Sequence, residues 1–170
     1  MILFTKHYRG AAGMDADIHP LPITTREANE LIKNADGVCV ARGPVYPDGW
    51  LRTLVEEVEK RHKLNVQFAG ASVPCWVKWQ NSGGKNDARR PRIVRYLCGS
   101  CIYVTRAVIE TVGALDERLG LCQAMVEWQN AASGQMAAKS LWVPGVWCER
   151  ERCTRAEMRE RTAFLRRTVE

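Results

Sequence analysis

The sequence ANELIKNADGVCVARGPVYPDGWLRTLVEEVEK, Ala28–Lys60, decides the fold because it joins two helices through a short apolar strand. The first helix is expected to begin at Thr24, which precedes Glu27 by three residues as in a capping box, and to end at the Asp-Gly pair that follows it. The run VCVA is then a short buried strand. A loop with two prolines leads to the second helix, GWLRTLVEEVEKRHK, which opens at Pro47 or Asp48 and repeats apolar residues at helical spacing.

Strands and helices alternate on both sides of this stretch. Further strands are expected at residues 2–5, 65–69, 75–79, 93–104 (one strand or two) and 139–143, and further helices at residues 105–112 and 125–133. Gly134 is expected to end the helix at 125–133, and Pro144 the strand at 139–143. The alternation predicts an α/β fold, with a mostly parallel sheet built from Ile2 to Val143 and helices on both faces. Trp50 is expected to pack the second helix against that sheet.

The length and composition are those of one globular domain. The chain has 170 residues, 46% of them apolar, which is enough to bury a core. The N-terminal residues lack the long apolar region of a signal peptide, and no run approaches the roughly 18 apolar residues that span a bilayer. We therefore expect a soluble, cytoplasmic protein without a membrane span. Residues 151–170 form a separate basic segment, in which the spacing of Thr154 and Glu157 predicts a C-terminal helix.

Seven cysteines, an odd number without a signal peptide, indicate reduced thiols. Two pairs have spacings that invite a zinc site: Cys98 with Cys101, and Cys148 with Cys153. The first pair lies in the apolar run YLCGSCIYV, and residues three apart in a strand point to opposite faces. We therefore favour buried thiols over zinc, and we expect no metal, no other cofactor and no intrachain disulfide.

The net charge of +6 is concentrated in two stretches. Residues 80–96 combine a single acid with five basic residues in a loop rich in Gly, Asn and Ser: Lys85, Arg89, Arg90, Arg92 and Arg95. Residues 149–170 hold seven arginines against five glutamates. A basic loop of this kind either binds an anionic ligand or is simply solvated, and the sequence leaves both interpretations open.

Two stretches resemble the glycosyltransferases of family 2, which have a GT-A fold. In the first, a helix with the pattern N-x-G-I-x-x-A-x-G is followed by a strand, a turn and the run P-P-G-W-L; the matching residues are Asn29, Ile32, Ala35, Gly37, Pro47, Gly49, Trp50 and Leu51. In the second, LCGSCIYVTRAVIETVGALDERLG, the family run G-x-x-x-x-x-R-R-x-x-x-x-x-x-G-x-x-D-E is matched by Gly99, Arg106, Gly113, Asp116 and Glu117. The resemblance covers roughly residues 25–150.

The resemblance implies a Rossmann-like GT-A domain over residues 1–150, shortened at its N-terminus, that binds a nucleotide-sugar at the C-terminal ends of its strands. In the family, an acidic DxD turn holds a divalent cation on the donor diphosphate, and a later acid acts as base toward the acceptor hydroxyl. Here the turn after Val40 reads ARGPV, which contains Arg42 and no carboxylate. Asp48 is the nearest acid and is expected to cap a helix or to lie in the donor site. Glu127 is the surviving candidate base.

Two functions from different classes follow. The first is a metal-independent glycosyltransferase, in which the donor diphosphate is neutralised by Arg42 and the basic loop residues Lys85, Arg89, Arg90 and Arg92. The second is a non-catalytic GT-A-derived module that binds nucleic acid or another anionic partner, with Trp76, Trp79 and Tyr96 beside the basic loop to stack on bases. Neither the sugar, the acceptor nor the oligomeric state follows from the sequence.

Overall fold

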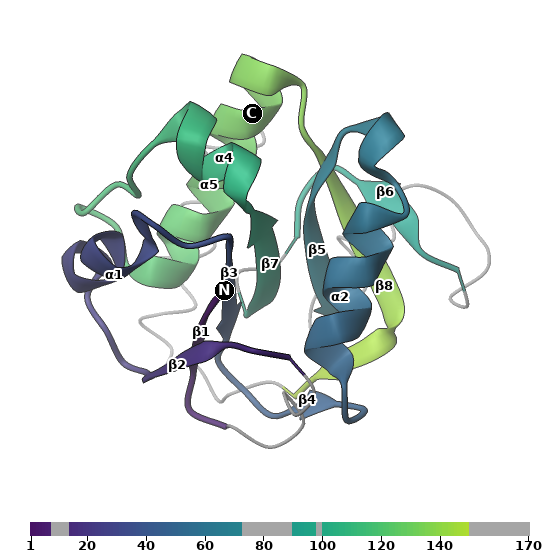
Figure 1. Cartoon of the computed structure of the whole chain (residues 1–170), viewed down its shortest axis with the longest axis horizontal. Helices are drawn as coiled ribbons and strands as arrows, with labels where there is room; N and C mark the ends of the chain where they lie inside the picture. The colour runs from purple at the N-terminus through teal and green to yellow at the C-terminus, as the bar shows by residue number, and fades with distance from the viewer. Residues whose placement is uncertain (8–13, 73–89, 98–99, 150–170) are drawn as a thin grey trace, which may run out of the picture.

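The computed structural model describes residues 1–7, 14–72, 90–97 and 100–149, which form an α/β fold around one mixed sheet (Figure 1). The eight strands within these ranges are β1 Ile2–Thr5, β2 Asp17–Pro20, β3 Gly37–Ala41, β4 Val45–Tyr46, β5 Val66–Ser72, β6 Arg92–Val94, β7 Cys101–Thr105 and β8 Lys139–Cys148. The helices are α1 Thr25–Ile32, α2 Trp50–Glu59, α4 Arg106–Val112 and α5 Leu121–Met136, with a short 3-10 turn at His62–Leu64.

The strand order is β2-β1-β3-β7-β5-β8-β4, and β6 also pairs with β8. Strands β1, β2 and β3 are mutually parallel along the sheet, as are β5 and β8. Because β7 is antiparallel to both β3 and β5, these five strands all run in the same direction. Their C-terminal ends share one edge of the sheet, here called the carboxyl edge. The expectation of a mostly parallel sheet is thus only partly right, since β4, β6 and β7 run the other way.

Helices cover both faces of the sheet, as the sequence predicts. Alternation along β3 sends Val40 into one core with α1, α4 and α5, and Cys39 into another beneath α2. Trp50 begins α2 and is only 1% exposed within the second core, so its predicted packing against the sheet is confirmed. In Figure 1, α2 lies in front of β5 and β8, while α1, α4 and α5 gather at the left.

The capping box that opens the first helix is confirmed. Thr24 accepts a hydrogen bond at Oγ1 from Glu27 N, and the Glu27 carboxylate accepts one from Thr24 N. The second helix begins later than expected, because Gly49 rather than Pro47 or Asp48 is its N-cap. Gly49 has φ 78°, a left-handed conformation that a residue without a side chain adopts at little cost.

Two expected ends are wrong in the later half of the chain. Helix α5 runs through Gly134 to Met136, because a single glycine inside a packed helix costs only about 1 kcal/mol. Strand β8 continues past Pro144 to Cys148. The register with β5 shifts between the pair Ala71–Val143 and the next pair, Ser72–Trp147. The missing N–H of Pro144 therefore falls where the regular ladder is interrupted.

Buried Asn29 joins the two family-like stretches in space. Its Nδ2 donates to Leu115 O at 3.0 Å and to Glu117 Oε1 at 3.2 Å, and its Oδ1 accepts from Leu115 N at 2.8 Å. Thr25, also buried in α1, donates through Oγ1 to Leu119 O. The loop that follows α4 is therefore held on α1 by the side chains of Thr25 and Asn29.

A second buried amide, Gln129 in α5, holds the segment between β6 and β7. Its Oε1 accepts from Leu97 N at 2.8 Å and from Ser140 Oγ at 2.9 Å, and its Nε2 donates to Leu97 O at 3.1 Å. Leu97 fills the space above Gly70, where an added Cβ would lie 2.8 Å from the leucine side chain. Of the two possibilities expected for residues 93–104, one strand or two, the structure has two, β6 and β7, with Leu97 between them.

The expected strand at 75–79 and the expected helix at 151–170 lie outside the described residues. Within the described ranges, every helix lacks the length and apolar character needed to cross a membrane.

Candidate functional site

The carboxyl edge, at the lower side of Figure 1, collects the ends of strands that are far apart in the sequence. In open α/β sheets, ligands bind in the crevice at this edge, where neighbouring strands lead to opposite sides. Here the chain leaves β1 for β2 on one side, while β3 lies on the other side of β1. Here this position between β1 and β3 is called the switch point, and Arg42, which follows β3 directly, lies beside it in the chain.

The backbone holds Arg42 firmly at the edge. Its N–H donates to Ser100 O at 2.8 Å, which ties the end of β3 to the start of β7, and its side chain is partly buried. Asp48 is exposed six residues later and is not the helix cap, because that position belongs to Gly49. A permanent cation beside the switch point can bind an anion such as a phosphate through two parallel N–H donors.

The described part of the basic loop lies on the outer side of the sheet. Cross-strand pairing places Val40, Ile102, Gly70, Trp142 and Arg92 in one row. The row spans four strand spacings, or about 19 Å. The guanidinium of Arg92 lies 4.6 Å from the centroid of the Trp142 ring, a cation–π contact within the sheet. A ligand that contacts both Arg42 and Arg92 must therefore lie across the ends of β7, β5 and β8.

Of the other basic residues of this loop, the structure describes Arg90 and Arg95. Arg90 is exposed just before β6, whereas Lys85 and Arg89 lie outside the described residues. Arg95 is exposed, with its guanidinium 5.3 Å from the Tyr96 ring centroid. The sequence grouped these basic residues with Arg42 as one phosphate site, but the sheet separates Arg92 from Arg42.

Glu127 is half-buried in α5, and Asn130 Nδ2 donates to its Oε2 at 3.4 Å. The bond from Thr25, which begins α1 after β2 ends, to Leu119 places the start of α5 near the carboxyl edge. Glu127 then lies about 9 Å along the helix axis from Leu121. The carboxylate is thus set back from the edge at which Arg42 lies, and the structure does not bring the two together.

The buried thiols gather beneath α2. Cys39, Cys101 and Cys148 are free and at most 1% exposed. The hydrogen bond with Cys148 favours the Cys101 thiolate, but the hydrogen bond with Cys39 and burial together raise the pKa of Cys101 well above its ordinary value. The Cys101 hydrogen bond and burial also raise the pKa of Cys148. Neutral thiols are poor nucleophiles and poor metal ligands, so we assign these three cysteines to the hydrophobic core. Among the described residues, no group of three or more His, Cys, Asp or Glu side chains could hold a metal ion.

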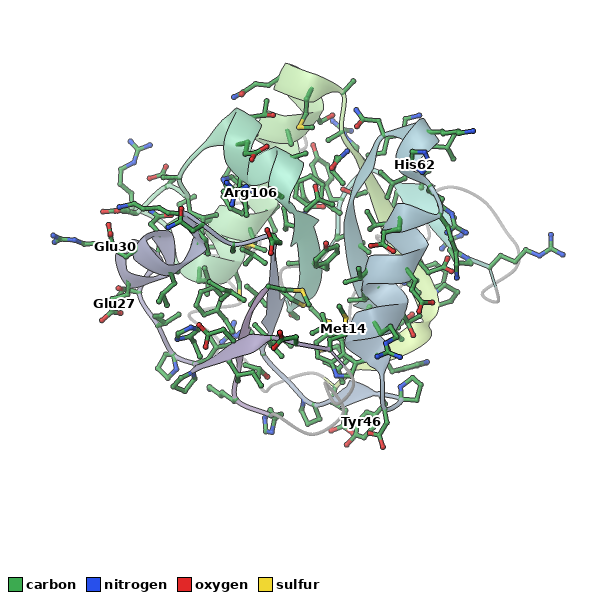
Figure 2. The ribbon with its side chains drawn as sticks, in the orientation of Figure 1. Met14, Glu27, Glu30, Tyr46, His62 and Arg106 are labelled. Carbon is green, nitrogen blue, oxygen red and sulfur yellow. The ribbon has the colours of Figure 1, made fainter. Side chains whose placement is uncertain are left out.

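Sequence reasoning missed two exposed aromatics at the carboxyl edge. Tyr46 and Trp147 lie opposite each other in the β4–β8 pair and are 50% and 51% exposed. Figure 2 shows Tyr46 at the lower end of the molecule, while His62 and Arg106 mark the opposite edge. The alternation in VPGVWC was the available signal, but the expected strand end at Pro144 concealed it.

No protein-family model and no curated protein sequence matches this chain.

Proposed function

We propose that this chain is a divergent glycosyltransferase-like protein that binds a nucleotide-sugar at the carboxyl edge without a resident metal ion. The observation that carries the proposal is the contact between the two family-like stretches. Asn29 of the first stretch binds both the backbone at Leu115 and the side chain of Glu117 in the second. Residues that were identified by their sequence pattern alone thus contact each other, which supports the interpretation that the two stretches belong to one domain.

Arg42 is the residue expected to bind the donor diphosphate. It follows β3 at the switch point, and the turn ARGPV offers no carboxylate to hold a divalent cation there. A guanidinium binds phosphate bidentately and keeps its charge at any physiological pH. Glu127 is the base to test, and its place along α5 requires that the acceptor hydroxyl reach the flank of that helix rather than its first turn.

The proposal is tested by calorimetric titration with UDP-, GDP- and CDP-sugars in EDTA. One donor is expected to bind, and Arg42→Ala should weaken it by about 10–100-fold, since a hydrogen bond to a charged group contributes roughly 1.5–3 kcal/mol. Lys63→Ala is the matched control, because Lys63 is an exposed cation before β5, at the opposite edge of the sheet. Addition of Mg²⁺ or Mn²⁺ should leave the affinity unchanged.

Three outcomes would contradict the proposal. The first is the absence of saturable binding with every donor, and the second is an Arg42→Ala variant that binds as the wild type does. The third is donor binding that requires a divalent cation, which would mean that the turn after Val40 was wrongly assigned. Binding of single-stranded nucleic acid with a steep salt dependence would instead favour the non-catalytic alternative.

A further inference from the structure

Strand β4 and the end of β8 form a short antiparallel ribbon at the carboxyl edge. Val45 pairs with Cys148 and Tyr46 pairs with Trp147. A further bond from Glu149 N to Pro44 O, 2.8 Å long, extends the same register by one residue. Side chains alternate along a strand, so Val45 and Cys148 enter the core beneath α2 while Tyr46 and Trp147 point the other way.

The outward side of this ribbon is here called the aromatic face and comprises Pro44, Tyr46, Trp147 and Glu149. Directly opposed residues in an antiparallel pair have Cβ atoms roughly 4.5–5.5 Å apart, so the two aromatic side chains are immediate neighbours. Each is about half exposed. Glu149 follows Trp147 by two residues and is also exposed, which puts a carboxylate on the same side as the rings.

The ribbon is tightly packed. A Cβ at Gly43 would lie 2.1 Å from Glu149 O. The two backbone segments therefore approach each other more closely than any residue other than glycine at position 43 allows. The aromatic face is thus mounted on a fixed backbone and is available to a ligand without prior ordering.

We propose that the aromatic face binds a neutral saccharide and, as a deepening of the proposed function on which this role rests, holds the acceptor sugar for transfer. One face of a pyranose ring presents C–H groups, which suit the partly negative face of an aromatic ring. Its hydroxyl groups donate to a carboxylate such as Glu149, which only accepts hydrogen bonds.

The charges near the face favour a neutral ligand over a polyanion. Glu149 lies on the face, and Asp48 is exposed two residues beyond Tyr46. Arg42 lies two residues before Pro44, so the two segments that carry the rings, residues 42–48 and 145–149, hold two acids and one base. A nucleic-acid strand needs a surplus of cations along its path, whereas a sugar needs hydrogen-bond acceptors beside its stacking surface.

The test omits any nucleotide-sugar and follows tryptophan fluorescence and calorimetry during titration of the full chain with cellotetraose, maltotetraose and mannotetraose. At least one tetrasaccharide should bind saturably. Trp147→Ala and Tyr46→Ala should each weaken that binding by about tenfold or more, and Glu149→Gln by a few-fold. Ile93→Ala is the control, because Ile93 is 45% exposed on β6, along the same outer side of β8, and should leave binding unchanged.

The proposal is overturned if none of the three tetrasaccharides binds, or if folded Trp147→Ala, checked by circular dichroism, binds as tightly as wild type. It is also overturned if Trp147→Ala abolishes binding of a single-stranded oligothymidylate while no sugar binds. Arg42→Ala is tested in the donor titration, whereas the Tyr46 and Trp147 variants are tested in the saccharide titration. Saccharide binding in the absence of donor binding would therefore reject the proposed function alone, and donor binding without saccharide binding would reject the aromatic face alone.

Discussion

Replacement of Gln129 by Leu tests the buried amide that joins α5 to the segment before β7. Leucine has nearly the same size, so the change removes hydrogen bonds without opening a large cavity. It leaves the N–H and the C=O of Leu97 without their side-chain partner, and both are buried. An unsatisfied buried polar group costs about 1–3 kcal/mol. With partial compensation by the gain in apolar contact, we expect a loss of about 2–5 kcal/mol in the free energy of unfolding.

Urea denaturation, followed by tryptophan fluorescence and far-ultraviolet circular dichroism, measures this loss directly. The control is Gln135→Leu, the same change at an exposed position of the same helix, which should stay within about 0.5 kcal/mol of wild type. Gln129→Glu keeps the acceptor but removes the donor that faces Leu97 O, so it should also be destabilising. A Gln129→Leu variant as stable as Gln135→Leu would show that the buried amide contributes nothing to the free energy of unfolding.

Other variants test the remaining elements of the fold. Trp50→Ala should lower the free energy of unfolding by about 3–5 kcal/mol, because it empties a fully buried site; a loss below 1 kcal/mol in urea would contradict the packing. Burial is the main cause that raises the pKa of Tyr103 to about 12, and the nearby Cys39 and Glu59 add to it. Above about pH 10, the tyrosine of the unfolded chain therefore loses its proton before that of the folded chain. Stability should therefore fall between pH 10 and 12 in urea titrations, and Tyr103→Phe should remove that part of the fall, whereas an unchanged profile would exclude Tyr103 as its source. Gly43→Ala should separate the β4–β8 ribbon, because its Cβ would meet Glu149 O at 2.1 Å; a lower melting temperature with loss of hydrogen-exchange protection at Glu149 N is expected, and full protection would argue against the close approach.

Local patterns were sufficient to predict much of this chain. The capping box at Thr24, the apolar strand before Arg42 and the burial of Trp50 all depend on residues within a few positions of each other, and helical or strand periodicity reports such relations directly. The same patterns predicted an α/β fold with helices on both faces. They also identified Asn29 and the second family-like stretch, though not that the two would touch.

Tertiary structure alone decided how the strands were arranged and which side chains met. Strand β7 lies antiparallel between β3 and β5, and a row of about 19 Å across the sheet separates Arg92 from Val40, two residues before Arg42, although the sequence indicates one phosphate site for both arginines. Tyr46 and Trp147 are about a hundred residues apart and become neighbours only through the register of β4 with β8. Strand pairing is a non-local choice, made by the fit of whole elements in the two cores, and the sequence near any one residue carries little information about it.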